Sequence, residues 1–138
     1  MTFSKAEVEY LTTQIHGRMA TVQPNGTLQV SPVGFSFNPE TSTIDVLGMN
    51  LAQSRKYRNI ADNGRVAFVV DDILSTDPWR VRCLEIRGHA EVIAPSPALA
   101  DDHLDGALIR IHPERVISFG VDDPEHEPHE LVPHNRNV

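Results

Sequence analysis

Apolar and polar positions follow helical spacing at the start of the chain. Ser4 and Glu7 occupy the N-cap and N3 positions of a capping box, in which each side chain bonds the other residue's backbone N–H. Three apolar residues then recur at helical spacing, at Val8, Leu11 and Ile15. This pattern predicts an N-terminal helix that lays one apolar stripe on the core and stops near Gly17.

Most of the remaining chain has the period of two that is typical of β-strands. Residues 18–22 and 27–37 flank the turn sequence QPNG and predict a hairpin. Pro32 lies inside the second of these strands and cannot donate a ladder hydrogen bond, so that strand is expected at an edge or with a bulge. Further strands are expected at residues 43–48, 65–72, 80–94 and 107–120, the last as one or two strands.

The segments between the strands predict few other elements. Residues 52–62 and 96–106 suit short helices, and residues 73–79 suit a loop. Gly88 suggests a bulge in its strand. Acidic residues, His and Pro dominate residues 122–138, which predicts a loosely packed tail. About six strands with few helices, mostly joined by hairpins, favour a mainly β fold, a small antiparallel barrel with peripheral helices.

Composition and charge exclude several classes of protein. The chain has 138 residues, of which 40% are hydrophobic and 22% charged, which is ordinary for one globular domain. Its net charge of −7 disfavours broad binding to nucleic acid or to an anionic membrane. Cys83 is the only cysteine, and no apolar run is long enough to span a bilayer. We therefore expect a cytoplasmic protein without nucleic-acid or membrane partners.

One short stretch, SRKYRN at residues 54–59, concentrates positive charge. Arg55, Lys56 and Arg58 are a quarter of the twelve Lys and Arg residues in the chain. The stretch opens or lies within an expected helix, whose first turn presents unpaired N–H groups suited to phosphate. Charge-assisted hydrogen bonds from Arg and Lys would strengthen such a site. The alternative is a solvated basic face of an amphipathic helix.

A second basic group, Arg80, Arg82 and Arg87, lies on the expected strand 80–94. At a period of two, Arg80 and Arg82 share one face of the strand, whereas Arg87 falls on the other. These side chains either extend an anionic site or form ion pairs with nearby Asp and Glu residues.

Other chemistry-bearing residues give weaker signals. Pro78 and Trp79, on the expected loop, either wall a pocket or belong to the core. The tail gathers imidazoles among carboxylates, at His126, His129 and His134. Two prolines and the lack of a helical frame argue against a metal site there. No catalytic motif is recognisable, so we assign no catalytic residue, and a cofactor must carry the chemistry of any enzyme.

Three segments together resemble the split-barrel flavin-binding proteins of the pyridoxamine 5′-phosphate oxidase superfamily. They are GRMATVQPNGTLQVSPVGFSF, SRKYRNIADNGRVAFVVDD and CLEIRGHAEVI, and the resemblance runs from about Gly17 to Gly120. The chain is most similar to the branch that uses coenzyme F420, an 8-hydroxy-5-deazaflavin with a phosphate and a polyglutamate tail. The resemblance implies a six-stranded antiparallel split barrel of the FMN-binding type, as one domain over residues 1–138 with its core at 17–120.

The resemblance also implies a cofactor site. In that family the S-R-K motif contacts the cofactor phosphate, the strand matching VSPV flanks the ring, and the end of the next strand approaches the ring or the phosphate. Two subunits pair so that two cofactors lie along their interface, which implies a homodimer. The positions that inherit these contacts are Ser31, Pro32, Val33, Met49, Asn50, Ser54, Arg55 and Lys56. Three further cofactor-binding candidates are Asn59, Pro78 and Trp79, the last of these also for the partner subunit's site.

Two departures separate this chain from pyridoxamine phosphate oxidases. Leu28 to Phe37 contains no Arg or Lys, and the chain ends in HELVPHNRNV rather than in a basic substrate-binding motif. The expected activity is therefore hydride transfer between F420 and an electron-poor small molecule, such as a quinone, an enone or a conjugated pigment. F420 is expected in preference to FMN. The alternatives are a non-catalytic F420 carrier and an FMN-bound flavin reductase.

Overall fold

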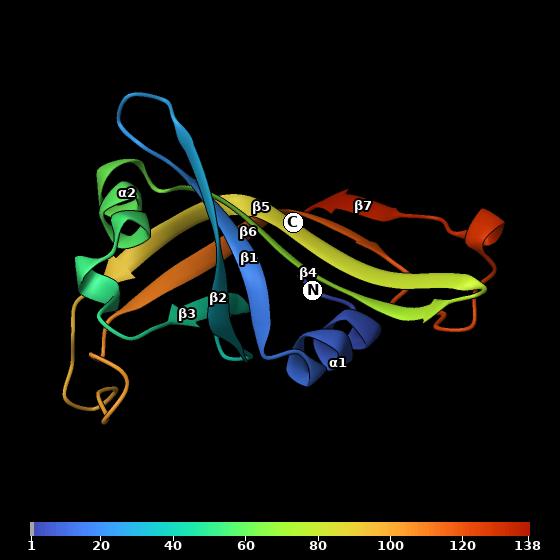
Figure 1. The fold of residues 1–138 in the computed structure, drawn as a ribbon, viewed down its shortest axis with the longest axis horizontal. Helices are drawn as coiled ribbons and strands as arrows, with labels where there is room; N and C mark the ends of the chain where they lie inside the picture. The colour runs from blue at the N-terminus through green and yellow to red at the C-terminus, as the bar shows by residue number, and fades with distance from the viewer. Residues whose placement is uncertain (1) are drawn as a thin grey trace.

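The computed structural model describes residues 2–138, most of which form one antiparallel sheet. The strands are β1 (His16–Val22), β2 (Leu28–Asn38), β3 (Thr43–Leu47), β4 (Arg65–Thr76), β5 (Trp79–Ile93), β6 (Leu108–Phe119) and β7 (His134–Asn137). The helices are α1 (Lys5–Thr13) and α2 (Arg55–Asn63), with short 3-10 turns η1 (Leu51–Gln53) and η2 (Pro128–Glu130). In Figure 1, α2 lies at one end of the long axis and α1 lies below the middle of the sheet.

The sheet closes on itself as a split barrel, which confirms the predicted fold class. Its strand order is β3-β2-β1-β4-β5-β6-β7, and an additional pairing joins β3 to β6. Two strands pair with the edge of β6 that faces away from β5: residues 109–111 of β6 pair with β3, and residues 115–118 pair with β7. The first six strands therefore make the expected barrel, and β7 is a seventh strand that the sequence did not predict.

Alternation along the strands fills the barrel with apolar side chains. Met19 of β1 and Phe68 of β4 are register partners, and both are buried. The largest fully buried side chains of the core also include Leu11, Ile44, Leu51, Leu84, Ile86, Ile109 and Ile111. Because neighbouring residues on these strands point outward, one face of each strand is left for solvent or for a partner.

The N-terminal helix begins as predicted and ends earlier than predicted. The Ser4 and Glu7 side chains form both capping-box hydrogen bonds. The helix ends at Thr13 rather than near Gly17, and Ile15 is 84% exposed instead of packing on the core. Gly17 instead serves β1, because a Cβ there would lie 2.6 Å from the Phe68 ring.

The expected loop at residues 73–79 is wrong. β4 continues to Thr76 and β5 begins at Trp79, so the two strands form a long hairpin that turns at Asp77 and Pro78. This hairpin extends to the end of the molecule opposite α2 (Figure 1). We refer to its outer part, residues 71–83, as the arm.

Two other expectations near the C-terminus are also wrong. Residues 96–106 form turns rather than a helix, because the Asp101 carboxylate accepts hydrogen bonds from the N–H groups of His103 and Leu104 and holds the chain in a turn. The end of the expected loose tail is ordered instead, since β7 pairs with β6 and Arg136 reaches Glu7 of α1.

The predicted irregularities at Pro32 and Gly88 are confirmed. β2 pairs with β3 only from Gly34 onward, so Pro32 lies on an open edge. The register between β5 and β6 shifts at Gly88, where a Cβ would lie 2.1 Å from the His112 carbonyl oxygen. Neither described helix, α1 or α2, is long and apolar enough to cross a membrane.

Candidate functional site

The N-terminus of α2 is built by Ser54 and the turn before it. The Ser54 hydroxyl donates to the Leu51 carbonyl at 2.6 Å and accepts from the Tyr57 N–H at 3.3 Å. This cap fixes the direction of the helix start and leaves the N–H groups of Arg55 and Lys56 without helical partners. The Ser54 side chain is thus engaged in capping, and the orphan N–H groups beside it are available to an anion.

Positive charge at this helix start is not balanced by the protein itself. The first turn of α2 contains no acidic residue. Within residues 2–138, Arg55, Lys56 and Arg58 form no ion pair, whereas six other arginines do, namely Arg18, Arg80, Arg82, Arg87, Arg110 and Arg136. Cations at a helix N-terminus oppose the helix dipole, so the arrangement is unfavourable unless an anion binds.

Asn59 connects α2 to β2, the strand that is expected to flank the cofactor ring. Its side-chain amide donates to Thr21 at 3.0 Å and to Gln29 at 3.3 Å, and the residue is only 1% exposed. Arg55 and Lys56 precede Asn59 by four and three positions, so they lie on the same side of α2 one turn toward its N-terminus. The two cations are therefore held beside the β1–β2 hairpin.

Two buried polar atoms in this region have no partner. They are the Ser31 hydroxyl oxygen and the amide oxygen of Asn59. Ser31 follows Gln29 by two positions, so both side chains point to the same face of β2. An unsatisfied buried polar atom costs about 1–3 kcal/mol. A polar ligand that lies against this face of β2 would relieve that cost, so these residues fit a flavin-like group.

The remaining ring-flanking candidates lie along the split in the barrel. Leu47 is the last residue of β3 paired with β2, and the chain then leaves the sheet through Met49 and Asn50. Both residues are exposed, and Asn50 has a left-handed φ of 50°. The part of β2 before Gly34 has no β3 partner, and there Pro32 is exposed and Val33 is buried. This edge of β2 therefore stays open beside Met49 and Asn50.

Pro78 and Trp79 are not brought to this region within one chain. They lie at the tip of the arm, at the opposite end of the molecule from α2 (Figure 1). Trp79 is 49% exposed there and is not a core residue. Any contact of Trp79 with a cofactor must therefore involve a second subunit.

A carboxylate that the sequence did not indicate lies near the helix start. The Asp105 side chain accepts a hydrogen bond from the Ala52 N–H of η1 at 3.0 Å. It thereby anchors the loop between β5 and β6 to the turn that precedes Ser54. The only sequence signal was the turn-forming pair Asp105–Gly106, which gave no indication of its partner.

The second basic group is confirmed as a set of ion pairs, not an extension of the site. Arg80 pairs with Glu127, Arg82 with Asp72 and Arg87 with Glu85. Arg82 holds Asp72 through both guanidinium branches, at 2.9 and 2.6 Å. The hydrogen bonds from Arg82 lower the pKa of Asp72 against the effect of burial.

The surroundings of Cys83 and of the tail histidines do not indicate a catalytic or metal-binding role. Burial, followed by the charges of Asp71 and Glu85, raises the pKa of Cys83 to about 11, so its thiol stays protonated at neutral pH. His126 is buried and contacts the Asp123 carbonyl through Nδ1. Across residues 2–138, no three His, Cys, Asp or Glu side chains are grouped closely enough to hold a metal ion.

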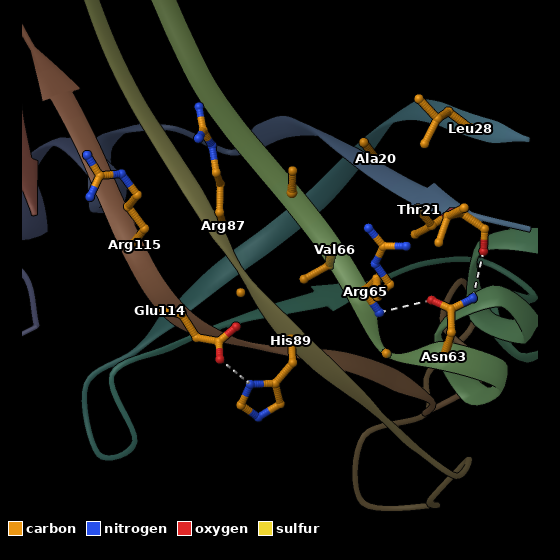
Figure 2. Close-up of a pocket in the computed structure, with 14 residues that line it drawn as sticks. Ala20, Thr21, Leu28, Asn63, Arg65, Val66, Arg87, His89, Glu114 and Arg115 are labelled. Atoms are coloured by element: carbon orange, nitrogen blue, oxygen red, sulfur yellow. Dashed lines mark hydrogen bonds and ion pairs between the residues drawn. The ribbon is translucent and has the colours of Figure 1, made fainter. Parts of the chain in front are cut away.

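A cavity lies elsewhere, on the outer face of the sheet near the C-terminal end of α2. Its volume is about 540 Å³, and none of the predicted site residues lines it (Figure 2). Sequence reasoning missed this cavity, because its residues come from five strands and the end of a helix.

Comparison with known proteins adds a family and a fold. The sequence profile of the pyridoxamine 5′-phosphate oxidase family matches residues 3–120. A protein of Streptomyces rimosus named 5a,11a-dehydrotetracycline/5a,11a-dehydrooxytetracycline reductase is 40% identical over 122 residues, covering 88% of this chain and 86% of that one. A conserved hypothetical protein of Mycobacterium tuberculosis has a similar structure, with a TM-score of 0.68, 21% identity and 84% of each chain covered. An FAD-binding protein of Mycobacterium smegmatis matches with a TM-score of 0.59 and 19% identity, over 84% of this chain and 93% of that one.

Proposed function

Because the chain belongs to the pyridoxamine 5′-phosphate oxidase family, we propose that it is an oxidoreductase that uses coenzyme F420 to reduce an electron-poor small molecule. The observation that carries this proposal is the start of α2, where Arg55 and Lys56 have no ion pair beside orphan N–H groups. The cofactor phosphate binds there, held by charge-assisted hydrogen bonds from both side chains.

The rest of the site orients the ring. Ser31 and Asn59, whose buried side-chain oxygens have no partner, would hold the ring beside β2. Val33 and the chain at Met49 and Asn50 border the ring where β3 has left β2. Asn59 is a positioning residue in this scheme, because its hydrogen bonds fix the helix relative to β2.

The chemistry follows from a cofactor held beside an open edge. When bound, reduced F420 would be the two-electron hydride donor, and solvent would supply the one proton that the substrate also gains. The protein's own residues bind and orient the reactants, and such positioning accounts for large rate accelerations without an acid–base side chain. This is consistent with the protonated thiol of Cys83.

An enone is the favoured substrate class. The relative from Streptomyces rimosus is named as a reductase of 5a,11a-dehydro compounds, which supports reduction of a conjugated double bond by this chain too. Pyridoxamine phosphate oxidation is not proposed, since β2 carries no Arg or Lys from Leu28 to Phe37.

A non-catalytic F420 carrier would use the same binding site, and turnover distinguishes it from an enzyme. Reduced F420 is mixed with menadione, 2-cyclohexenone or 5a,11a-dehydrotetracycline, and its oxidation is followed by absorbance with and without protein. We expect at least one acceptor to be reduced faster with protein than without it. If no acceptor is reduced faster although F420 binds tightly, the carrier is the correct description.

We also propose a homodimer that covers the outer face of β1, β2 and β4. Leu28 and Val30 are 79% and 69% exposed there, and by register Ala20 and Ala67 lie beside them. A contiguous apolar patch in the middle of a sheet is typical of an interface. A two-fold partner would bury this patch and bring its arm, with Trp79, toward the cofactor.

Light scattering tests the dimer. The wild type should have twice the 15.3 kDa mass of one chain at micromolar concentration. Val30→Asp should shift the mass toward the monomer, because it places a charge in an apolar interface. Val132→Asp is the matched control, since Val132 is 68% exposed but lies in the tail. A monomeric wild type, or equal masses for the two variants, would contradict the proposed interface.

A further inference from the structure

A buried polar cluster joins α2 to the inner face of the β1–β2 hairpin. Thr21 of β1 and Gln29 of β2 are register partners, and Asn59 of α2, the helix beside this hairpin in Figure 1, donates to both. Thr21 and Asn59 are 3% and 1% exposed, whereas Gln29 is only partly buried. Leu28 and Val30, which the proposed dimer covers, point to the opposite face of β2. The cluster therefore faces away from that interface.

The hydrogen bonds of the cluster fix the direction of each amide. The Gln29 Oε1 atom accepts from the Thr21 hydroxyl at 3.5 Å and from Asn59 Nδ2 at 3.3 Å. Asn59 Nδ2 also donates to the Thr21 hydroxyl at 3.0 Å, so both of its N–H bonds are used. The amide nitrogen of Asn59 thus faces the hairpin, and its carbonyl oxygen points away from Thr21 and Gln29.

The carbonyl oxygen of Asn59 is the unsatisfied part of this arrangement. It is buried and accepts no hydrogen bond within residues 2–138. An amide oxygen accepts but cannot donate, so only a ligand with an N–H or O–H group can satisfy it. An ionised phosphate ester has neither, so an anion bound at Arg55 and Lys56 leaves this oxygen unpaired. The cost of an unpaired buried acceptor therefore favours a ligand that also carries a donor.

Two features indicate the kind of donor. The two N–H bonds that Asn59 donates polarise its amide and strengthen the oxygen as an acceptor. Ser31, two positions after Gln29 on the same face of β2, has a second buried oxygen without a partner, and its hydroxyl can donate to a carbonyl group. β2 has no β3 partner before Gly34, so a flat ring can approach this face from the open edge. An acceptor and a hydroxyl donor on one side of the hairpin fit a ring edge in which an N–H group stands beside a carbonyl, as in an imide.

From this arrangement we infer that Asn59 determines specificity for an imide ring, by accepting a hydrogen bond from the imide N–H. Gln29 and Thr21 are positioning residues, because they act on the ligand only through the amide of Asn59. The inference rests on the proposed cofactor site but not on the identity of the cofactor, since F420 and FMN both carry a pyrimidinedione ring with one imide N–H. A ring methylated at that nitrogen loses the donor and gains a methyl group.

The inference is tested by titrating F420 and FMN, each beside its derivative methylated at the imide nitrogen, with fluorescence as the readout. Whichever parent cofactor binds should bind the wild type at least about tenfold more tightly than its methylated derivative, because methylation leaves the Asn59 oxygen unpaired. In Asn59→Leu, whose side chain has nearly the same volume, this preference should largely disappear. The retained volume keeps any steric effect of the methyl group, so the lost preference reports on the hydrogen bond.

Two further variants separate positioning from general loss of the site. Gln29→Leu removes the acceptor that orients Asn59 and should reduce the preference for the unmethylated ring. Ser31→Ala removes the other unpartnered oxygen, so it should weaken binding of both rings by similar factors and leave the preference unchanged. Because the Ser31 hydroxyl has no protein partner, Ser31→Ala should not destabilise the free protein. Circular dichroism and thermal unfolding check that each variant is folded.

Four results would overturn the inference. One is a wild type that binds methylated and unmethylated rings equally, a comparison that requires no variant. Another is a preference as large in folded Asn59→Leu as in the wild type, since methylation would then act only through its bulk. The third is an unchanged preference in folded Gln29→Leu, and the fourth is absence of binding by both parent cofactors. Binding of FMN without F420 would refute the proposed cofactor and leave this test in force with FMN.

Discussion

Replacing Arg55 and Lys56 together with Ala should weaken F420 binding at least about 100-fold and leave the fold intact. Each side chain is expected to contribute about 1.5–3 kcal/mol of charge-assisted hydrogen bonding to the phosphate, and about 1.4 kcal/mol corresponds to tenfold in affinity. The free protein should lose no stability, because neither side chain forms an ion pair. Removing cations from a helix N-terminus should even stabilise the free protein slightly.

Fluorescence titration of F420 into the wild type and the variants gives these affinities. Arg55→Lys should recover only part of the loss, since an ammonium group cannot bind two phosphate oxygens as the planar guanidinium does. Lys5→Ala/Arg58→Ala is the control for net charge and should bind nearly as well as the wild type. Equal affinity of the wild type and the folded Arg55→Ala/Lys56→Ala variant would favour the solvated helix face instead.

Replacing Arg136 with Ala should destabilise the protein by about 2–4 kcal/mol, because a buried carboxylate loses its partner. Glu7 is 1% exposed, and Arg136 binds both of its oxygens, at 2.5 and 3.0 Å. Arg136 also donates to the Thr2 carbonyl at 2.7 Å, so it connects β7 to the chain before α1. Ser118 remains to donate to Glu7 at 2.6 Å, which keeps the loss below that of a completely unpaired charge.

Urea denaturation measures this loss, with Arg18→Ala as the matched control. Arg18 also binds a carboxylate, that of Asp71 at 2.9 Å, but that pair is exposed. Its removal should cost no more than about 1 kcal/mol. Glu7→Gln combined with Arg136→Ala should recover part of the stability, because it removes the buried charge. Similar losses for Arg136→Ala and Arg18→Ala would contradict the role assigned to β7.

The pH dependence of this pair has a definite sign. Burial alone would raise the pKa of Glu7, but hydrogen bonds from Arg136, Ser118 and the Ser4 backbone outweigh it, so the pKa lies below its ordinary value of 4.5. The ionised carboxylate therefore stabilises the wild type above pH 4.5, and this contribution is lost as the pH falls through the lowered pKa. Without Arg136, burial dominates and raises the pKa of Glu7. The stability difference between wild type and Arg136→Ala should thus shrink in acid.

The features that the sequence predicted correctly depend on residues that are close together along the chain. The capping box needs only Ser4 and Glu7, and the bulge needs only Gly88. Pro32 indicated an open edge because its own nitrogen cannot donate. The helix α2 was also predicted, although it begins at Arg55 rather than at the expected residue 52.

The elements that the sequence missed depend on distant contacts. β7 is held by pairing with β6 and by the contact of Arg136 with Glu7, which are 129 positions apart. The arm was mistaken for a loop because Asp77 and Pro78 suggested a break, whereas the strands resume pairing directly beside them.

The most direct test of the proposed function is a pair of titrations of the purified wild-type protein, one with F420 and one with FMN, followed by fluorescence. The proposal predicts tight, salt-sensitive binding of F420 and much weaker binding of FMN. Tight binding of FMN with no binding of F420 would contradict it.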